Sequence, residues 1–150
     1  MKVVVQRVKK GGVLIYSNNY NKNINKGYVI LLGVKEGDNK KDAIYLADKC
    51  TKLRVFEDEN GKMNLSIKDI NGEILVISQF TLYGDARKGN RPSFVKAARP
   101  EDAENLYNSF VDRLRTNVGK DKVATGIFGE MMEVKIINDG PVTIIINSKE

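Results

Sequence analysis

Histidine is absent from the 150-residue sequence, and this absence excludes more chemistry than any other feature of its composition. Ser-His-Asp and Cys-His relays need an imidazole base, and His-ligated catalytic metals need imidazole ligands, so all of these are excluded. Any hydrolysis must therefore depend on backbone dipoles, on a Thr or Lys side chain, or on a group that the substrate brings. We expect no metal site and no cofactor.

Cysteine is nearly absent, and long apolar runs are missing. Cys50 is the only cysteine, which excludes an intrachain disulfide and a multi-cysteine zinc site. It falls in a segment with helical periodicity, where we expect a small buried side chain instead of a reactive thiol. No apolar run approaches the roughly 20 residues that cross a bilayer, and the N-terminal segment turns polar too early for a signal peptide. We therefore expect a cytoplasmic protein that has no membrane partner.

Positive charge is what the sequence has in excess. Its 25 Lys and Arg residues outnumber 19 Asp and Glu residues, which gives a formal net charge of +6. A basic surface favours polyanionic partners such as nucleic acid, because cationic side chains displace the counterions of phosphates. Charge alone does not identify a nucleic-acid-binding protein, however, because many basic proteins bind none.

The hydrophobic pattern predicts a single α/β domain over residues 1–150. One helix is expected from a cap at Asp38 to about residue 52, and a second from Pro100 to a stop at Gly119. The stretch 16–26 is expected to be a hairpin loop. Strands are predicted over 2–8, 12–16, 27–34, 73–80, 123–128, 131–138 and 142–147. We predict mixed β-sheets with both helices packed on one side and, because strands outnumber helices, a second β layer (α/β/β).

Three polar segments interrupt this pattern. Ser78–Thr81 follows a buried strand, where polar groups can reach a ligand, although the hydroxyls could equally satisfy neighbouring backbone groups. Asn138–Pro141 contains Asp-Gly, which favours an ordinary tight turn, and a Gly-Pro bond that can be cis. Arg87–Pro92 is a basic loop that can wrap a phosphate backbone or remain a solvated loop. None of the three is decisive alone.

Taken together and in order, the segments resemble the D-aminoacyl-tRNA deacylase family. The two most specific are Ser78-Gln79-Phe80-Thr81-Leu82-Tyr83 and Asn138-Asp139-Gly140-Pro141-Val142-Thr143. The resemblance covers almost the whole chain, and only the Asn-rich stretch 16–26 departs from it. The other matching segments are 3–8, 53–58, 61–64, 91–94 and 128–132.

The resemblance implies a homodimer whose active sites lie at the subunit interface. Gly140 and Pro141 of one subunit would form a cis motif that enters the partner's pocket and rejects L-aminoacyl esters. Arg7 would hold this motif in place. The resemblance further implies that Ala103, Phe128 and Met132 surround the terminal adenosine and the aminoacyl group. The expected partner is aminoacylated tRNA, whose backbone would be bound by Arg87, Lys88 and Arg91.

The implied reaction is hydrolysis of the ester bond of D-aminoacyl-tRNA, with the 2′-hydroxyl of the tRNA helping to activate water. Backbone N–H groups near Phe80 and Thr81 would hold the oxyanion, and Ser78 and Gln79 would orient the substrate. Thr81 as a nucleophile ranks second, because no base is adjacent to it in sequence. Glycyl-tRNA would also be a substrate, since glycine has no side chain to exclude.

Two other functions are compatible with the residues. One is a catalytically idle RNA-binding module, which turnover would distinguish from an enzyme. The other is a hydrolase of small amides or esters, whose substrate binding would not depend on salt.

Overall fold

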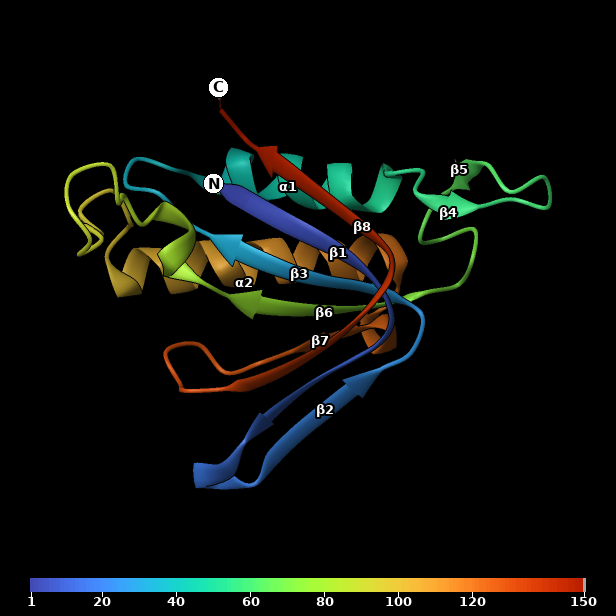
Figure 1. Cartoon of the computed structure of the whole chain (residues 1–150), viewed down its shortest axis with the longest axis horizontal. Coiled ribbons are helices and arrows are strands. Elements are labelled where there is room, and N and C mark those ends of the chain that lie inside the picture. Colours follow the sequence, from blue (N-terminus) through green and yellow to red (C-terminus); the bar gives the residue numbers. More distant parts are fainter. Residues whose placement is uncertain (150) are drawn as a thin grey trace.

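The computed structural model describes residues 1–149 as a mixed sheet with two helices along one face (Figure 1). The helices are α1 (Lys40–Lys52) and α2 (Pro100–Val118). The strands of the main sheet are β1 (Lys2–Ile15), β2 (Tyr20–Ile24), β3 (Gly27–Gly33), β6 (Glu73–Ser78), β7 (Val123–Thr125) and β8 (Glu133–Asn147). The remaining elements are a small hairpin of β4 (Phe56–Glu57) and β5 (Met63–Leu65) and 3-10 turns at Tyr16–Asn18, Phe80–Tyr83 and Lys120–Lys122.

The sheet combines parallel and antiparallel pairs, as the sequence predicts. β3, β6 and β7 are parallel neighbours, whereas β1 runs antiparallel to β2, β3 and β8. The first half of β1 pairs with β3 and the second half with β2. β8 pairs with both halves of β1 along the other edge, and residues 139–142 are left out of this pairing. The sheet therefore divides where β1 changes partner, and its lower half folds away from the helices (Figure 1).

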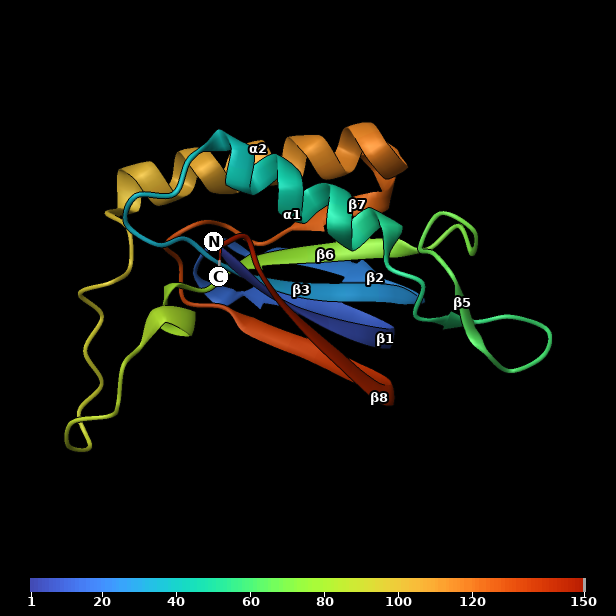
Figure 2. The same ribbon diagram turned by 90° about the horizontal axis from the view of Figure 1, so that it is seen from above.

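Two separate cores confirm the second β layer. Tyr28 and Ile30 of β3 point toward the helices and join the larger core, which includes Leu46 of α1 and Phe110 of α2. Val29, in contrast, faces the other side. There it packs in a smaller core with other buried side chains from β1, β2 and β6, namely Val8, Val13, Ile24, Leu75 and Ile77. Figure 2 shows both helices on one side of the sheet.

The predicted breaks at 8–12 and 138–142 are wrong. β1 continues through Gly11 and Gly12 as one strand of 14 residues, and β8 continues through Gly140 and Pro141 as one strand of 15 residues. The two long strands pair with each other, with register shifts between Gln6 and Lys10. Long-range pairing therefore overrides the local turn chemistry of Asp-Gly-Pro.

Smaller differences concern element ends. Asn39, not Asp38, caps α1, because its side chain accepts from the N–H of Lys41 while Asp42 reaches back to the N–H of Asn39. The stretch 16–26 contains a strand, β2, and not only a hairpin loop. The strands predicted over 73–80 and 123–128 end at Ser78 and Thr125.

Helix α2 begins at Pro100 and ends before Gly119, as predicted. Cys50 is fully buried on α1, which confirms the expected packing role, and burial raises the pKa of its thiol to about 12. No helix within residues 1–149 is long and apolar enough to span a membrane.

Candidate active site

The segment that follows β6 turns sharply as it leaves the sheet. Ser78 pairs with Leu32 of β3, and the N–H of Gln79 donates to the carbonyl of Leu32 at 2.8 Å. The chain then forms the 3-10 turn Phe80–Tyr83. Within this turn, Nε2 of Gln79 donates to Oγ1 of Thr81 at 3.1 Å. The rigid strand therefore presents a short polar segment at the end of the sheet.

A pocket of about 590 Å³ lies beside this segment. It is bounded by the end of β6, the first turn of α2 and the loop 128–132, and most of its lining is apolar. Five residues that the sequence analysis proposes for the site line it: Ser78, Phe80, Ala103, Phe128 and Met132. Gln79 and Thr81 flank the pocket without being among its lining residues. The structure thus brings together segments that are 50 residues apart in the chain.

Aromatic side chains give the pocket its shape. Phe80 is 56% exposed, and its ring meets that of Phe94 edge to face, with centroids 5.2 Å apart. Phe128 contacts Tyr107 of α2, with centroids 6.1 Å apart. Phe94 was not predicted as a site residue, because its loop has no periodicity. The signal that could have found it is its place in the segment 91–94, which resembles the D-aminoacyl-tRNA deacylase family. An exposed, mostly apolar pocket of this kind suits the base or side chain of a ligand.

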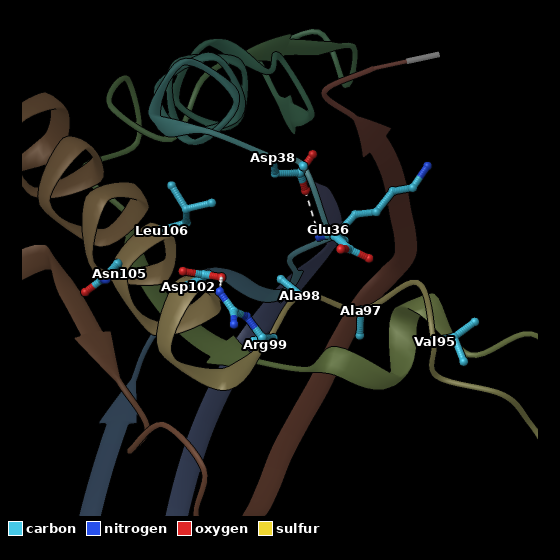
Figure 3. Close-up of a pocket in the computed structure, with 11 residues that line it drawn as sticks. Glu36, Asp38, Val95, Ala97, Ala98, Arg99, Asp102, Asn105 and Leu106 are labelled. Atoms are coloured by element: carbon cyan, nitrogen blue, oxygen red, sulfur yellow. Dashed lines mark hydrogen bonds and ion pairs between the residues drawn. The ribbon is translucent and has the colours of Figure 1, made fainter.

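A second hollow, of about 580 Å³, adjoins the first (Figure 3). The segment Ala97–Arg99 lines both. Figure 3 shows Asp102, Asn105 and Leu106 entering from α2, and an ion pair of 3.4 Å joins Arg99 to Asp102. Its other charged residues are Lys35, Glu36 and Asp38. Asp38 is paired with the N-terminal amine and with Lys149. Glu36 and Asp102 therefore remain against Lys35 and Arg99, and this balance of charge does not favour a phosphate.

Gly140 and Pro141 lie at the opposite end of the sheet from the pocket, and their peptide bond is cis. Arg7 pairs with Tyr28, whereas Ser78 pairs with Leu32. Four residues of β3 separate these positions, which corresponds to roughly 13 Å along the strand. Within one chain, the motif and the pocket are therefore separated.

The side chain of Arg7 fastens the backbone next to this motif. Nε of Arg7 donates to the carbonyl of Asp139 at 3.0 Å, and Nη1 donates to the carbonyl of Val55 at 2.6 Å. Nη2 lies 3.2 Å from the place that a Cβ on Gly140 would occupy. Only 6% of Arg7 is exposed, so its planar guanidinium is removed from water and held in one orientation.

The basic loop projects from the end of the sheet near the pocket. The guanidinium of Arg87 donates two hydrogen bonds to the carboxylate of Asp85, from Nε at 2.9 Å and from Nη2 at 2.6 Å. This guanidinium holds the pKa of the Asp85 carboxyl well below its usual range. Lys88 and Arg91 are exposed, and neither has an ion-pair partner within residues 1–149. Lys88 and Arg91 therefore carry the charge that the loop offers to a polyanion.

Comparison with known proteins shows which family this chain resembles. The family model for D-Tyr-tRNA(Tyr) deacylase matches residues 4–147. A D-aminoacyl-tRNA deacylase of Flavobacterium psychrophilum is 58% identical over 149 residues, covering 99% of this chain and 98% of that protein. A D-aminoacyl-tRNA deacylase of Natranaerobius thermophilus is 54% identical over 150 residues, covering 100% of this chain and 99% of that protein.

Two solved structures share the fold of this chain. A c-Myc DNA Unwinding Element Binding Protein superposes with a TM-score of 0.93 at 42% identity, and the match covers all of both chains. A probable eukaryotic D-amino acid tRNA deacylase shares the fold, with a TM-score of 0.83 at 16% identity over 97% of this chain and 98% of that one. The family model and the relatives thus define an ester hydrolase that acts on aminoacyl-tRNA. The chain belongs to the D-Tyr-tRNA(Tyr) deacylase family.

Proposed function

We propose that this protein hydrolyses the ester bond of D-aminoacyl-tRNA in the cytoplasm, releasing free tRNA and a D-amino acid and sparing L-aminoacyl-tRNA. The observation that carries the proposal is the pocket between Phe80, Ala103 and Phe128, which opens beside the polar segment Ser78–Thr81. Ala103 is small and 92% buried, so it leaves room in the pocket wall for a planar group such as the terminal adenine.

The chemistry depends on backbone groups and on the substrate. The N–H groups of Phe80 and Thr81 begin the 3-10 turn, where the first N–H groups of a helical segment have no partner within it. Two such donors can hold the developing oxyanion, and each well-placed donor contributes about 3–4 kcal/mol. The tRNA 2′-hydroxyl adjoins the reacting ester and helps to activate water. Ser78 and Gln79 orient the substrate.

A nucleophilic role for Thr81 has less support. Its Oγ1 accepts a hydrogen bond from the amide of Gln79, at 3.1 Å. An amide cannot remove the proton of a hydroxyl, whereas a nucleophilic Thr needs an adjacent base. We therefore assign attack on the ester to water.

Two observations support a homodimer in which Gly140 and Pro141 enter the partner's pocket. First, the motif is remote from the pocket of its own chain, so the two can act together only across an interface. Second, the sheet face opposite the helices carries an apolar row across three strands. Val4 lies between Leu31 and Ile145 in this row, and Ile145 is 61% exposed. A second copy of the chain would remove this row from water.

Rejection of L-aminoacyl groups then follows from the shape of the composite site. The backbone carbonyls at Gly140 and Pro141, fixed by Arg7, would occupy the space that an L side chain requires. A D side chain would point outward, so tolerance for different D-amino acids is broad. Glycine has no side chain to exclude, so glycyl-tRNA is also a substrate. Unchanged stability of glycyl-tRNA in the presence of the enzyme would contradict this last point.

The interface can be tested by a disulfide between subunits, because the native Cys50 is buried and does not interfere. The test variant carries two substitutions in the same chain, Met131→Cys and Pro141→Cys. Met131 is 91% exposed and lies at the pocket rim. We expect a covalent dimer under oxidising conditions. The control replaces Met131 and Tyr16, which lies at the far β1–β2 turn, and should remain monomeric on a denaturing gel. Equal cross-linking in both would contradict the proposed interface.

A non-catalytic nucleic-acid-binding role is the second candidate, favoured by the unpaired cations Lys88 and Arg91 and by the name of the 42% identical DNA-element-binding relative. Binding of tRNA without turnover of its D-aminoacyl ester would support that role instead.

A further inference from the structure

A third pocket, of about 550 Å³, has no part in the chemistry proposed above. It lies between the last turns of α1 and α2 and the turn that follows β5, away from the first turn of α2 where the active pocket lies (Figure 2). Its floor is a hydrogen-bonded network that joins the two helices. Arg113 binds Asp48 through Nε at 2.7 Å and Nη2 at 3.0 Å, and Asn117 donates to both Asp48 and Thr51.

The rim of this pocket carries unbalanced positive charge. Lys52, Arg54 and Lys68 line it, and none has an ion-pair partner within residues 1–149. The charge of Asp48 is taken by Arg113, so Asp69 is the one remaining carboxylate. A carboxylate oxygen of Asp69 is itself occupied by the N–H of Ser66, at 2.8 Å. Three cations thus face the single negative charge of Asp69, which leaves a net positive charge at this pocket.

The ends of the helices do not account for this excess. Lys52 is the last residue of α1, where a cation interacts favourably with the helix dipole. Arg54 and Lys68, in contrast, belong to no helix. Nε of Arg54 donates to the carbonyl of Asn64 at 2.9 Å, which fixes the guanidinium and leaves its terminal nitrogens free. A guanidinium held in this way, with two lysines lining the same pocket, is suited to phosphate oxygens.

We propose that this pocket binds backbone phosphates of the tRNA. Arg54 directly precedes Val55, whose carbonyl accepts from Arg7, and Arg7 in turn holds the backbone at Asp139. The cations are therefore joined to the end of the molecule that carries Gly140. The inference rests on the proposed function: if Gly140 enters the partner's pocket, these cations lie beside the tRNA whose 3′ end occupies that pocket. Each tRNA is then held by both subunits.

The test compares Arg54→Gln/Lys68→Gln with Lys40→Gln/Lys41→Gln, which removes the same charge from exposed positions on the first turn of α1. We expect the first pair to weaken tRNA binding about tenfold and to lower the slope of log K against log salt by about 1.5, because each lost phosphate contact contributes roughly 0.7–0.9. The control pair should change neither. Arg54→Lys keeps the charge but loses the guanidinium held by Asn64, so it should keep the salt dependence of the wild type and only part of its affinity.

Two further measurements separate the possible failures. Cleavage of D-tyrosyl-adenosine, which lacks the acceptor stem, should be equal in all variants, because this ester cannot reach the pocket of Arg54 and Lys68. If the wild type cleaves neither this ester nor D-tyrosyl-tRNA, the proposed function fails, while the comparison of tRNA affinities still stands. Titration with inorganic phosphate tests the other source of the same ligand. Equal loss of tRNA affinity in both pairs, or phosphate binding at this pocket with tRNA affinity unchanged, would overturn the assignment to RNA.

Discussion

Nε of Arg7 donates to the carbonyl of Asp139 at 3.0 Å, although 132 positions separate the two residues in sequence. This bond, together with the one from Arg7 to Val55, ties the first strand and the β4 region to the backbone beside Gly140. A guanidinium can make both bonds at once because its donors are arranged as a planar fork, which an ammonium lacks. Arg7 therefore acts as a positioning residue for the Gly140–Pro141 segment.

Replacement of Arg7 should affect both stability and stereochemical selectivity. We expect Arg7→Lys to lower the free energy of unfolding by about 1–3 kcal/mol, because a buried carbonyl loses its donor. Hydrolysis of L-tyrosyl-tRNA should rise relative to that of the D-ester. Denaturant unfolding and paired deacylation assays measure the two effects. Lys9→Ala, at an exposed position of the same strand, is the control. Unchanged selectivity in a folded Arg7→Lys enzyme would contradict the positioning role.

Thr81 and the substrate 2′-hydroxyl can be distinguished by kinetics. We expect Thr81→Val to keep kcat within about tenfold of the wild type, because the assigned oxyanion donors are backbone N–H groups. A tRNA that ends in 2′-deoxyadenosine should lose at least about 100-fold in rate with the wild-type enzyme. Single-turnover measurements give both values. Full activity on the 2′-deoxy substrate, together with an inactive Thr81→Val, would support the nucleophilic mechanism instead.

The basic loop should contribute unequally to tRNA binding. Lys88→Gln and Arg91→Gln should each raise KM for D-tyrosyl-tRNA and lower its dependence on salt by about one phosphate contact. Arg87→Gln should have a smaller effect on the salt dependence, because Asp85 already neutralises the Arg87 guanidinium. The largest effect from Arg87→Gln would show that the pair with Asp85 opens on binding.

Asp48 links the two helices and should make stability depend on pH. Its bidentate bond to Arg113 lowers the pKa of the carboxyl below its usual value. A carboxyl whose pKa is lower in the folded state stabilises that state above its unfolded pKa of about 3.9, and this contribution is lost as pH falls toward the folded value. Asp48→Asn should therefore be less stable at pH 7, by about 1–2 kcal/mol. The difference from the wild type should shrink below about pH 4.

Thermal or denaturant unfolding at pH 7 and pH 3 measures this dependence. Asp112→Asn, at an exposed position of α2, is the matched control and should change stability little at either pH. A constant deficit in Asp48→Asn at both values would show that the pair with Arg113 does not respond to protonation.

Much of the fold could be predicted from local sequence, and the errors have a common physical origin. The continuous apolar stretch of β3 and the amphipathic α2 are specified locally, so both were predicted within about two residues. β8 was divided into two strands because Asp139-Gly140 has turn chemistry. In the structure β1 pairs with β8 on both sides of that point. Pairing between chain ends cannot be derived from periodicity.

The candidate site, like the fold, could be predicted only where a local pattern or motif marks its residues. The end of a buried strand draws attention to Ser78–Thr81, but the site roles of Phe80, Ala103 and Phe128 come from the family resemblance. Phe94 lies in a loop and reaches the pocket only through tertiary packing against Phe80. The apolar row of Val4, Leu31 and Ile145 was also missed, because each side chain is unremarkable within its own strand. It becomes a surface feature only through the register of three strands.

The most direct test compares deacylation of D-tyrosyl-tRNA and L-tyrosyl-tRNA by catalytic amounts of the purified protein. We predict rapid, multiple-turnover loss of the D-ester while the L-ester decays at its spontaneous rate. Equal hydrolysis of both esters would contradict the chiral selection assigned to Gly140 and Pro141. Loss of neither, with tRNA still bound, would contradict the enzymatic function and leave a nucleic-acid-binding protein.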